Sequence, residues 1–393
     1  MEKKHPLHSD DERIEKLTEQ ADELLAAQKY TEASDLYKSI LLLEPENLHC
    51  QLNKATSDAL HPDSEYDVAA FGKWAEAVEA ARIALYEYYG ECQDFVDVFG
   101  KEIELLEHIA ISRATKALVA RKALAEKLDE DVASLCSTYT LQTINDPYQR
   151  EKQQEAMGML FTNGRQAQGA MVAYIAALLV SWTTQMRRFL ECFHTPELFD
   201  VHYFESLRSR VAAQQRKWHF ELASCFHCSL REQLIELMKA ENKASKESGE
   251  VIDQELKKIL AILDGYIKRC KDAIRAAYWQ AHTEERKKLE EERAALVSER
   301  ENREKEISAA EKKAETDNVA AQNVIAELQQ KRRALGIFKF KEKKEARAAI
   351  EAAEQEAVRI RNMGRDAVDK IVQKRDRLTE RIAAIDLEFT KDR

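Results

Sequence analysis

Three observations predict an all-α fold for this sequence. The 393-residue chain holds only 10 glycines and 5 prolines, so the turn residues that separate short strands are scarce. Charged residues make up 34% of the chain, above the usual quarter. Apolar residues recur along most of the chain at intervals of three or four, which is the spacing of one helix face.

Charge and cysteine content narrow the class of protein. The formal net charge of −10 argues against a general nucleic-acid coat, which needs the opposite sign. The 7 cysteines are odd in number and scattered, so we expect reduced thiols of a cytoplasmic protein rather than a disulfide framework. The first residues carry no apolar signal core, so we do not expect secretion.

Residues 1–62 are expected to form a helical hairpin. Apolar side chains at helical spacing begin at Ile14, and a short turn is expected at residues 28–30. The second helix is expected to end at Pro45, because proline cannot continue a helix.

Seven positions of this hairpin have the spacing of a known repeat: Leu17, Ala21, Leu24, Tyr30, Ala33, Tyr37 and Pro45. On these positions, residues 14–47 resemble a tetratricopeptide repeat (TPR). The resemblance implies two antiparallel helices whose backbones approach at Ala21 and Ala33, with the two tyrosines as packing residues. Gln28 and Ile40 depart from the motif, where glycine and alanine are common.

A second, degenerate copy is an open alternative for the next helices. Trp74-Ala-Glu-Ala77 echoes Tyr30-Thr-Glu-Ala33, but 44 residues later rather than at the usual repeat of about 34. The extra length would fit the turn-rich residues 61–67.

Residues 63–245 are predicted to form a helical bundle. Gly90 and Gly100 are candidate helix breaks, and a turn is expected at residues 145–147. The most apolar stretch, residues 170–182, is too short to cross a bilayer, so we expect a helix buried on all sides at the centre of the bundle. The alternative is a helix that faces a membrane or a partner.

Residues 251–393 are predicted to form an antiparallel coiled-coil hairpin with its turn near residues 335–340. The stretch contains no proline, and an imperfect apolar seam runs along it. The polar residues 243–250 are the expected domain boundary. A continuous helix that pairs with a second copy of the chain is the alternative to the intrachain hairpin.

The hairpin tip, residues 331–347, is the strongest candidate for a binding site. Basic and aromatic side chains gather there as expected partner-binding residues: Lys331, Arg332, Arg333, Phe338, Lys339, Phe340, Lys341, Lys343, Lys344 and Arg347. Such a surface suits an anionic membrane, RNA or an acidic partner. In the alternative, the two phenylalanines plug the end of the coiled coil and the basic residues cover helix ends.

The sequence holds few motifs that would indicate metal binding or catalysis. Cys225 and Cys228 have the spacing of half a zinc site, with His219 upstream, but the second half is missing, so we expect no metal. His108 lies in an apolar run and is expected to be a packed core histidine. No glycine-rich phosphate loop, nucleophile elbow or His-Glu-x-x-His motif occurs, so we expect no catalytic residues, cofactor or small-molecule substrate.

The sequence therefore favours a non-enzymatic protein-interaction scaffold or adaptor, with a TPR-like helical domain and a coiled-coil arm. It does not identify the protein partner, and a homodimer through the coiled coil is one alternative. The other alternative is a peripheral membrane or nucleic-acid binder that acts through residues 331–347.

Overall fold

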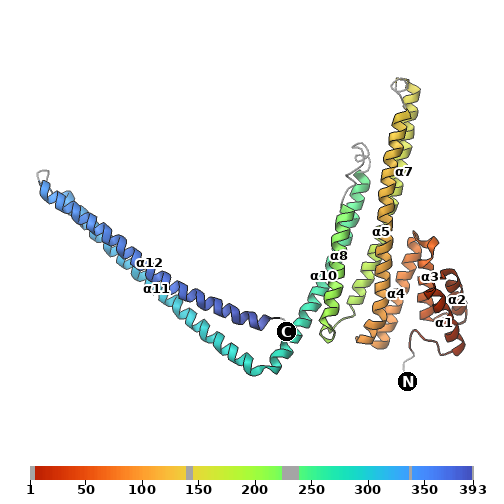
Figure 1. Ribbon diagram of the computed structural model, residues 1–393, viewed down its shortest axis with the longest axis horizontal. Helices are drawn as coiled ribbons and strands as arrows, with labels where there is room; N and C mark the ends of the chain where they lie inside the picture. The colour runs from red at the N-terminus through yellow and green to blue at the C-terminus, as the bar shows by residue number, and fades with distance from the viewer. Residues whose placement is uncertain (1–4, 139–144, 224–238, 336–338, 392–393) are drawn as a thin grey trace. The chain divides into compact units, whose positions relative to one another are not determined.

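The fold is all-α, as predicted. The computed structural model describes residues 5–138, 145–223, 239–335 and 339–391, and over these ranges it contains ten α-helices and no strand (Figure 1). The α-helices are α1 (Glu12–Ala26), α2 (Tyr30–Leu43), α3 (Leu48–Leu60), α4 (Val68–Tyr89), α5 (Gln93–Thr138), α7 (Pro147–Leu190), α8 (Val201–Ala223), α10 (Lys239–Ala281), α11 (Thr283–Ala334) and α12 (Phe340–Thr390). Two short 3₁₀ helices, η1 (Pro62–Ser64) and η2 (Pro196–Leu198), lie between them.

The chain divides into two compact units, Met1–Lys271 and Asp272–Arg393. The border falls inside α10, which also contains the polar residues 243–250 where the sequence suggested a boundary. A polar, glycine-containing stretch can also be helical, and Ser245 within it is buried, so composition alone did not distinguish it from a linker.

Short polar side chains begin the first helices of unit one. The Asp11 carboxylate accepts a hydrogen bond from the backbone N–H of Arg13 at 2.8 Å, and so caps α1. Asn47 caps α3 in the same way. Asp67 caps α4, because its carboxylate accepts hydrogen bonds from the backbone N–H groups of Ala69 and Ala70. Because these caps satisfy orphan N–H groups, they fix where each helix starts.

Helices α1 to α4 pack in chain order. Helix α2 packs against α1 and α3, and α3 packs against α4. Ala21 and Ala33 are fully buried between α1 and α2, and Tyr37 and Ile40 fill the adjoining core. Small side chains at the contact let two helices approach closely, which is the packing expected from the sequence.

A larger core joins α4, α5, α7, α8 and α10. Trp74, Trp182 and Trp218 are fully buried in it, and an aromatic side chain of this kind contributes on the order of 4–6 kcal/mol by its buried area. Gly90 ends α4 with a φ of 71°, as predicted, because glycine adopts this left-handed conformation without strain. Gly100, the other candidate break, lies within α5.

Helix α7 carries the apolar stretch 170–182. Ile175, Leu178 and Leu179 are buried, but Ala173 and Val180 are exposed, so the helix is not buried on all sides as expected. Among the described residues, α7 is the one helix long and apolar enough to cross a membrane by length and composition, and half of that window is buried inside the protein.

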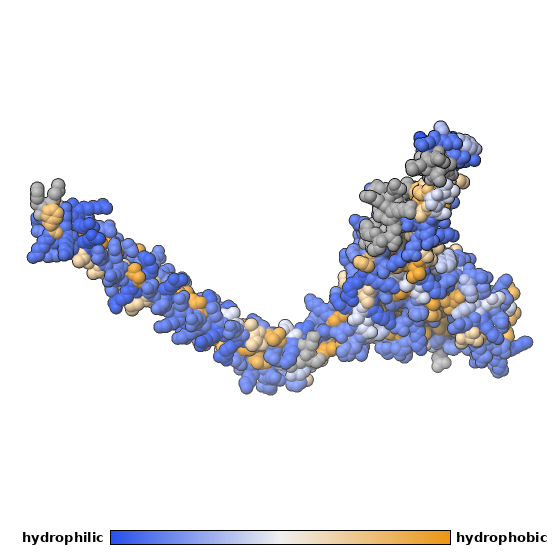
Figure 2. Space-filling model, turned by 45° about the horizontal axis from the view of Figure 1, so that its top comes forward, coloured by the Kyte–Doolittle hydropathy of each residue, from blue (hydrophilic) through white to orange (hydrophobic). Residues whose placement is uncertain are grey.

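Helices α11 and α12 lie antiparallel in unit two (Figure 1). Arg293 pairs with Asp386 at 2.6 Å, and Gly364 faces Ala314 so closely that a Cβ on the glycine would lie 2.8 Å from the alanine Cβ. Leu296, Leu378 and three further apolar residues (Ile382, Ile385 and Phe389) pack at the same end as the Arg293–Asp386 pair. Ile350, Ala357 and Leu378 are buried within the pair, whereas Val324, Val358 and Met363 are exposed. The face of the pair seen in Figure 2 is predominantly hydrophilic.

Candidate functional site

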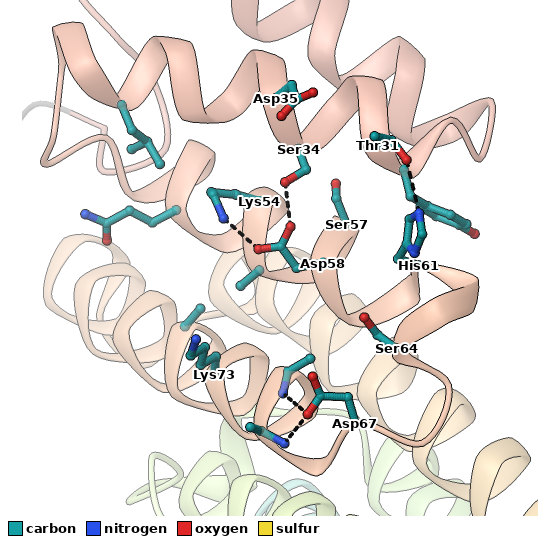
Figure 3. A pocket seen from close by; sticks show the side chains of 17 residues that line it. Thr31, Ser34, Asp35, Lys54, Ser57, Asp58, His61, Ser64, Asp67 and Lys73 are labelled. Atoms are coloured by element: carbon teal, nitrogen blue, oxygen red, sulfur yellow. Dashed lines mark hydrogen bonds and ion pairs between the residues drawn. The ribbon is translucent and has the colours of Figure 1, made fainter.

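Among the cavities that the described residues form, a groove in unit one combines small side chains with charged ones, which suits a docking site. It has a volume of about 610 Å³ and lies among α2, α3 and α4 (Figure 3). Four of its lining residues are alanines: Ala55, Ala69, Ala70 and Ala77. Because alanine is the smallest side chain with a Cβ, these positions leave room between the helices that larger residues would fill.

A hydrogen-bonded chain crosses one wall of the groove. The Ser34 hydroxyl donates to Asp58 Oδ1 at 2.5 Å, and Lys54 Nζ lies 2.6 Å from Asp58 Oδ2 (Figure 3). Both carboxylate oxygens are therefore engaged, and the chain ties α2 to α3. This arrangement gives Asp58 a structural role and leaves it poorly placed as a general base.

His61 closes one end of the groove. Its Nδ1 accepts from the backbone N–H of Asp63 at 3.2 Å, and its Nε2 lies 3.0 Å from the Thr31 hydroxyl (Figure 3). An accepting Nδ1 places the proton of a neutral imidazole on Nε2, which then donates to Thr31. The ring thus joins the end of α3 to the start of α2.

Asp35 and Lys73 give the groove its available charges. Both side chains are exposed, and among the described residues no ion pair engages either of them. Asp35 lies on α2 and Lys73 on α4, on opposite walls (Figure 3). The groove therefore presents one carboxylate and one ammonium to whatever lies between the walls.

Arg113 holds the edge of the groove in place. This arginine of α5 is buried, and its guanidinium donates to the backbone carbonyls of Ala59 and of Ser64, the latter at 3.1 Å. Ala59 lies in the last turn of α3, where a cation is also favoured by the helix dipole. The Tyr174 hydroxyl of α7 donates to the neighbouring carbonyl of Glu65.

The seven TPR-like positions take the following places. Ala21, Ala33 and Tyr37 are fully buried, Leu17 and Leu24 pack against them, Tyr30 begins α2, and Pro45 is exposed just beyond it. Tyr30 also lines the groove. Gln28 has a φ of 61°, the left-handed conformation that glycine adopts freely, so the position that departs from the motif is also a strained one.

A polar cluster not foreseen from the sequence lies beside this core. The Tyr37 hydroxyl donates to Asp22 Oδ1 at 2.5 Å, and His49 Nε2 lies 2.9 Å from both oxygens of Asp22. Burial alone would raise the pKa of Asp22, but the hydrogen bonds from His49, Tyr37 and Asn53 outweigh it and lower that pKa. Burial and this carboxylate raise the pKa of Tyr37. The cluster joins α1, α2 and α3 and is half-buried, as a structural network would be.

The predicted tip residues lie at the end of α11 and the start of α12. Lys331, Arg332 and Arg333 are exposed in the last turn of α11. In α12, Phe340 is 74% exposed, and the basic residues around it are exposed or half-buried: Lys339, Lys341, Lys343, Lys344 and Arg347. Phe338 lies outside the described residues.

The metal hypothesis gains no support from the described residues. Cys225 and Cys228 lie outside them, and no group of three or more His, Cys, Asp or Glu within them could hold a metal ion. Cys192 is buried and accepts a hydrogen bond from the Arg82 guanidinium at 3.1 Å. Because the Arg82 guanidinium already lies against the Cys192 sulfur, binding of a metal cation at that sulfur would be electrostatically unfavourable.

His108 was expected in the core, and this prediction was wrong. The ring is exposed, whereas the preceding Glu107 is 8% exposed. Leu106 and Ala110 form the buried face of α5, and His108, two residues after Leu106, lies on the other side of the helix. Burial raises the pKa of Glu107, and the Arg210 guanidinium at 3.3 Å offsets part of that rise.

Comparison with known proteins adds no family. No protein-family model, curated protein or solved structure matches the chain. The resemblance to a tetratricopeptide repeat therefore depends on the seven residues named above.

Proposed function

We propose that this protein is a non-enzymatic, cytoplasmic scaffold or adaptor that holds a segment of a protein partner in the groove among α2, α3 and α4. The observation that carries the proposal is the groove itself. It is about 610 Å³ in volume, has small side chains along its walls and presents Asp35 and Lys73 unpaired on opposite sides. A bound segment would bury its apolar side chains against the alanines and meet the two charges with opposite ones.

The resemblance of residues 14–47 to a tetratricopeptide repeat supports this proposal. Helices α1 and α2 would form one repeat-like hairpin, and α3 and α4 a degenerate second one. The contacts of α2 with both α1 and α3 fit such a stack. Stacked helical hairpins leave elongated surfaces between neighbouring helices, and these surfaces suit extended or helical segments better than small metabolites.

The α11–α12 pair would serve as an antiparallel coiled-coil arm. Each helix is 51 or 52 residues long, which corresponds to roughly 75 Å at 1.5 Å per residue. Part of its apolar seam, including Ile350, Ala357 and Leu378, packs within the chain, which suits a spacer that displays its tip. We therefore expect a monomer by light scattering, and a dimer that persists on dilution would instead favour the coiled coil as the dimerisation device.

A displayed peptide library selected on the full-length chain tests the groove. We expect the enriched peptides to carry one basic and one acidic residue flanking apolar ones. Asp35→Lys and Lys73→Glu should each weaken their binding on the order of tenfold, because an attraction becomes a repulsion. Peptides with the two charges exchanged should recover binding to the double variant.

Glu23→Lys on α1 and Lys38→Glu on α2 are matched controls, because both residues are exposed and neither lines the groove. They make the same charge changes and should leave binding as in the unmodified chain. If the groove variants bind the selected peptides as tightly as the controls do, the groove is not the docking site.

A further inference from the structure

We propose that the free end of the α11–α12 hairpin binds the surface of an anionic membrane. The inference is independent of the groove, because it depends on residues 331–335 and 339–347 of unit two alone. These two stretches hold eight basic residues and two acidic ones, which leaves a net charge of +6 in a protein whose total is −10.

The antiparallel register brings the two basic stretches together. Arg293 pairs with Asp386, and further along the hairpin Ala314 faces Gly364. The same register, continued to the end of the pair, places Lys331 level with Arg347. The basic residues of both helices are therefore concentrated at one end and form a compact patch instead of a stripe along the arm.

The C-terminal end of α11 explains only three of these eight basic residues. Lys331, Arg332 and Arg333 lie in the last turn of α11, where the helix dipole favours cations. Lys341 and Lys344 lie in the first turns of α12, where the dipole disfavours them, and no side chain caps that helix end. Basic residues that are unfavourable in the free protein become favourable beside a negatively charged surface.

The ion pairs at this end leave most of the charge available. Among the described residues, Glu342 pairs with Lys339 at 2.8 Å and Arg347 pairs with Glu351 at 3.2 Å. No ion pair engages Lys341, Lys344 or the three basic residues at the end of α11 within that described part. Clustered basic residues beside a helix are the feature that anionic lipid attracts.

Phe340 favours a lipid surface over the other anionic partners. The side chain is 74% exposed among the lysines, and an apolar patch lies amid hydrophilic residues at this end of the hairpin (Figure 2). An aromatic ring beside lysines can enter the headgroup region while the ammonium groups stay among the phosphates. Single-stranded RNA is instead held by stacking of its bases on aromatic side chains, so an RNA oligomer is the competing ligand for this patch.

Vesicle co-sedimentation of the full-length chain tests the proposal. The vesicles are phosphatidylcholine alone or phosphatidylcholine with about 30% phosphatidylserine, in salt of about 0.01 M and 0.15 M. We expect binding to the serine-containing vesicles only, and weaker binding at the higher salt. Lys341→Gln, Lys343→Gln and Lys344→Gln together should lower the partition coefficient on the order of 100-fold, about fivefold for each charge removed.

Phe340 has its own pair of variants. Phe340→Ala should weaken binding on the order of tenfold through the lost apolar contact. Phe340→Trp should retain binding, because tryptophan favours the membrane interface. Lys312→Gln with Lys313→Gln is the charge control, since both lysines are exposed in the middle of α11.

Each other outcome overturns the proposal. Equal binding to both kinds of vesicle would exclude recognition of anionic lipid. Tip variants that bind as tightly as the Lys312 and Lys313 control, with unchanged helicity by circular dichroism, would exclude the tip. Binding of a single-stranded RNA oligomer that is lost in the tip variants, without vesicle binding, would assign the patch to nucleic acid.

Discussion

Replacing Arg113 with methionine should destabilise unit one and loosen the edge of the groove. The substitution keeps a long side chain but removes the guanidinium that donates to the carbonyls of Ala59 and Ser64. Both acceptors belong to the segment where α3 ends and η1 begins, and this segment also positions His61. Loss of the arginine would leave these carbonyls without their charged donor.

The expected magnitude follows from the two hydrogen bonds. A hydrogen bond to a charged group contributes about 1.5–3 kcal/mol, so two of them give about 3–6 kcal/mol before any offset. Arg113 is only 7% exposed, so its charge is desolvated in the native state, and removing that charge returns part of the loss. We therefore expect a decrease of about 3 kcal/mol in the free energy of unfolding.

Urea titration followed by tryptophan fluorescence measures this change in the full-length chain. Three of the four tryptophans, Trp74, Trp182 and Trp218, are buried in unit one, so the signal reports mainly on that unit. Arg361→Met on α12 is the matched control, because this arginine is exposed and should change stability by less than about 0.5 kcal/mol. If Arg113→Met behaved like that control, the two carbonyl contacts would not stabilise the fold.

Three further predictions concern single positions in unit one. Gln28→Gly should raise the urea midpoint, with a gain of about 0.5–1 kcal/mol, because Gln28 holds a φ of 61° that glycine adopts without strain; Gln28→Val should lower it. The lowered pKa of Asp22 stabilises the fold above the unfolded-state pKa of about 3.9, and this contribution is lost as the pH falls through the folded-state value. Asp22→Asn should therefore lower stability at pH 7 and flatten the acid limb of a pH–stability curve, and an unchanged acid limb would contradict the assignment. Burial raises the pKa of Glu102, so its ionised form is disfavoured in the fold, and Glu102→Gln should raise the urea midpoint at pH 7 but not at pH 4.

Local sequence patterns predicted the fold class and several of the breaks. Gly90 and Pro147 mark helix ends because each has a backbone preference that acts at its own position. Gly100 has the same backbone freedom but lies inside α5, because tertiary packing decides whether a helix continues through a glycine. Glu107 and His108 show the same limit for burial, because tertiary contacts bury the charged Glu107 and leave the His108 ring exposed.

The candidate site could be predicted only in part. The basic residues of the tip could be predicted from the sequence, because they are close together in the chain and carry the same charge. The groove was not, because its walls come from α2 and α4, and no local pattern encodes which distant helices become neighbours. Arg113 was missed for the same reason: its partners lie 49 and 54 residues earlier in the chain.

The pairing of α11 with α12 makes the length of this hairpin adjustable in matched steps. Deleting seven residues, about two turns, from both helices at the same level would shorten the pair by about 10.5 Å and leave the tip residues in register. Deleting them from one helix alone would carry Gly364 away from Ala314 and bring bulkier side chains to a point where even a Cβ would lie 2.8 Å from the alanine Cβ. The hairpin can therefore be shortened to a chosen length only by equal deletions in α11 and α12, because Gly364 must stay opposite Ala314.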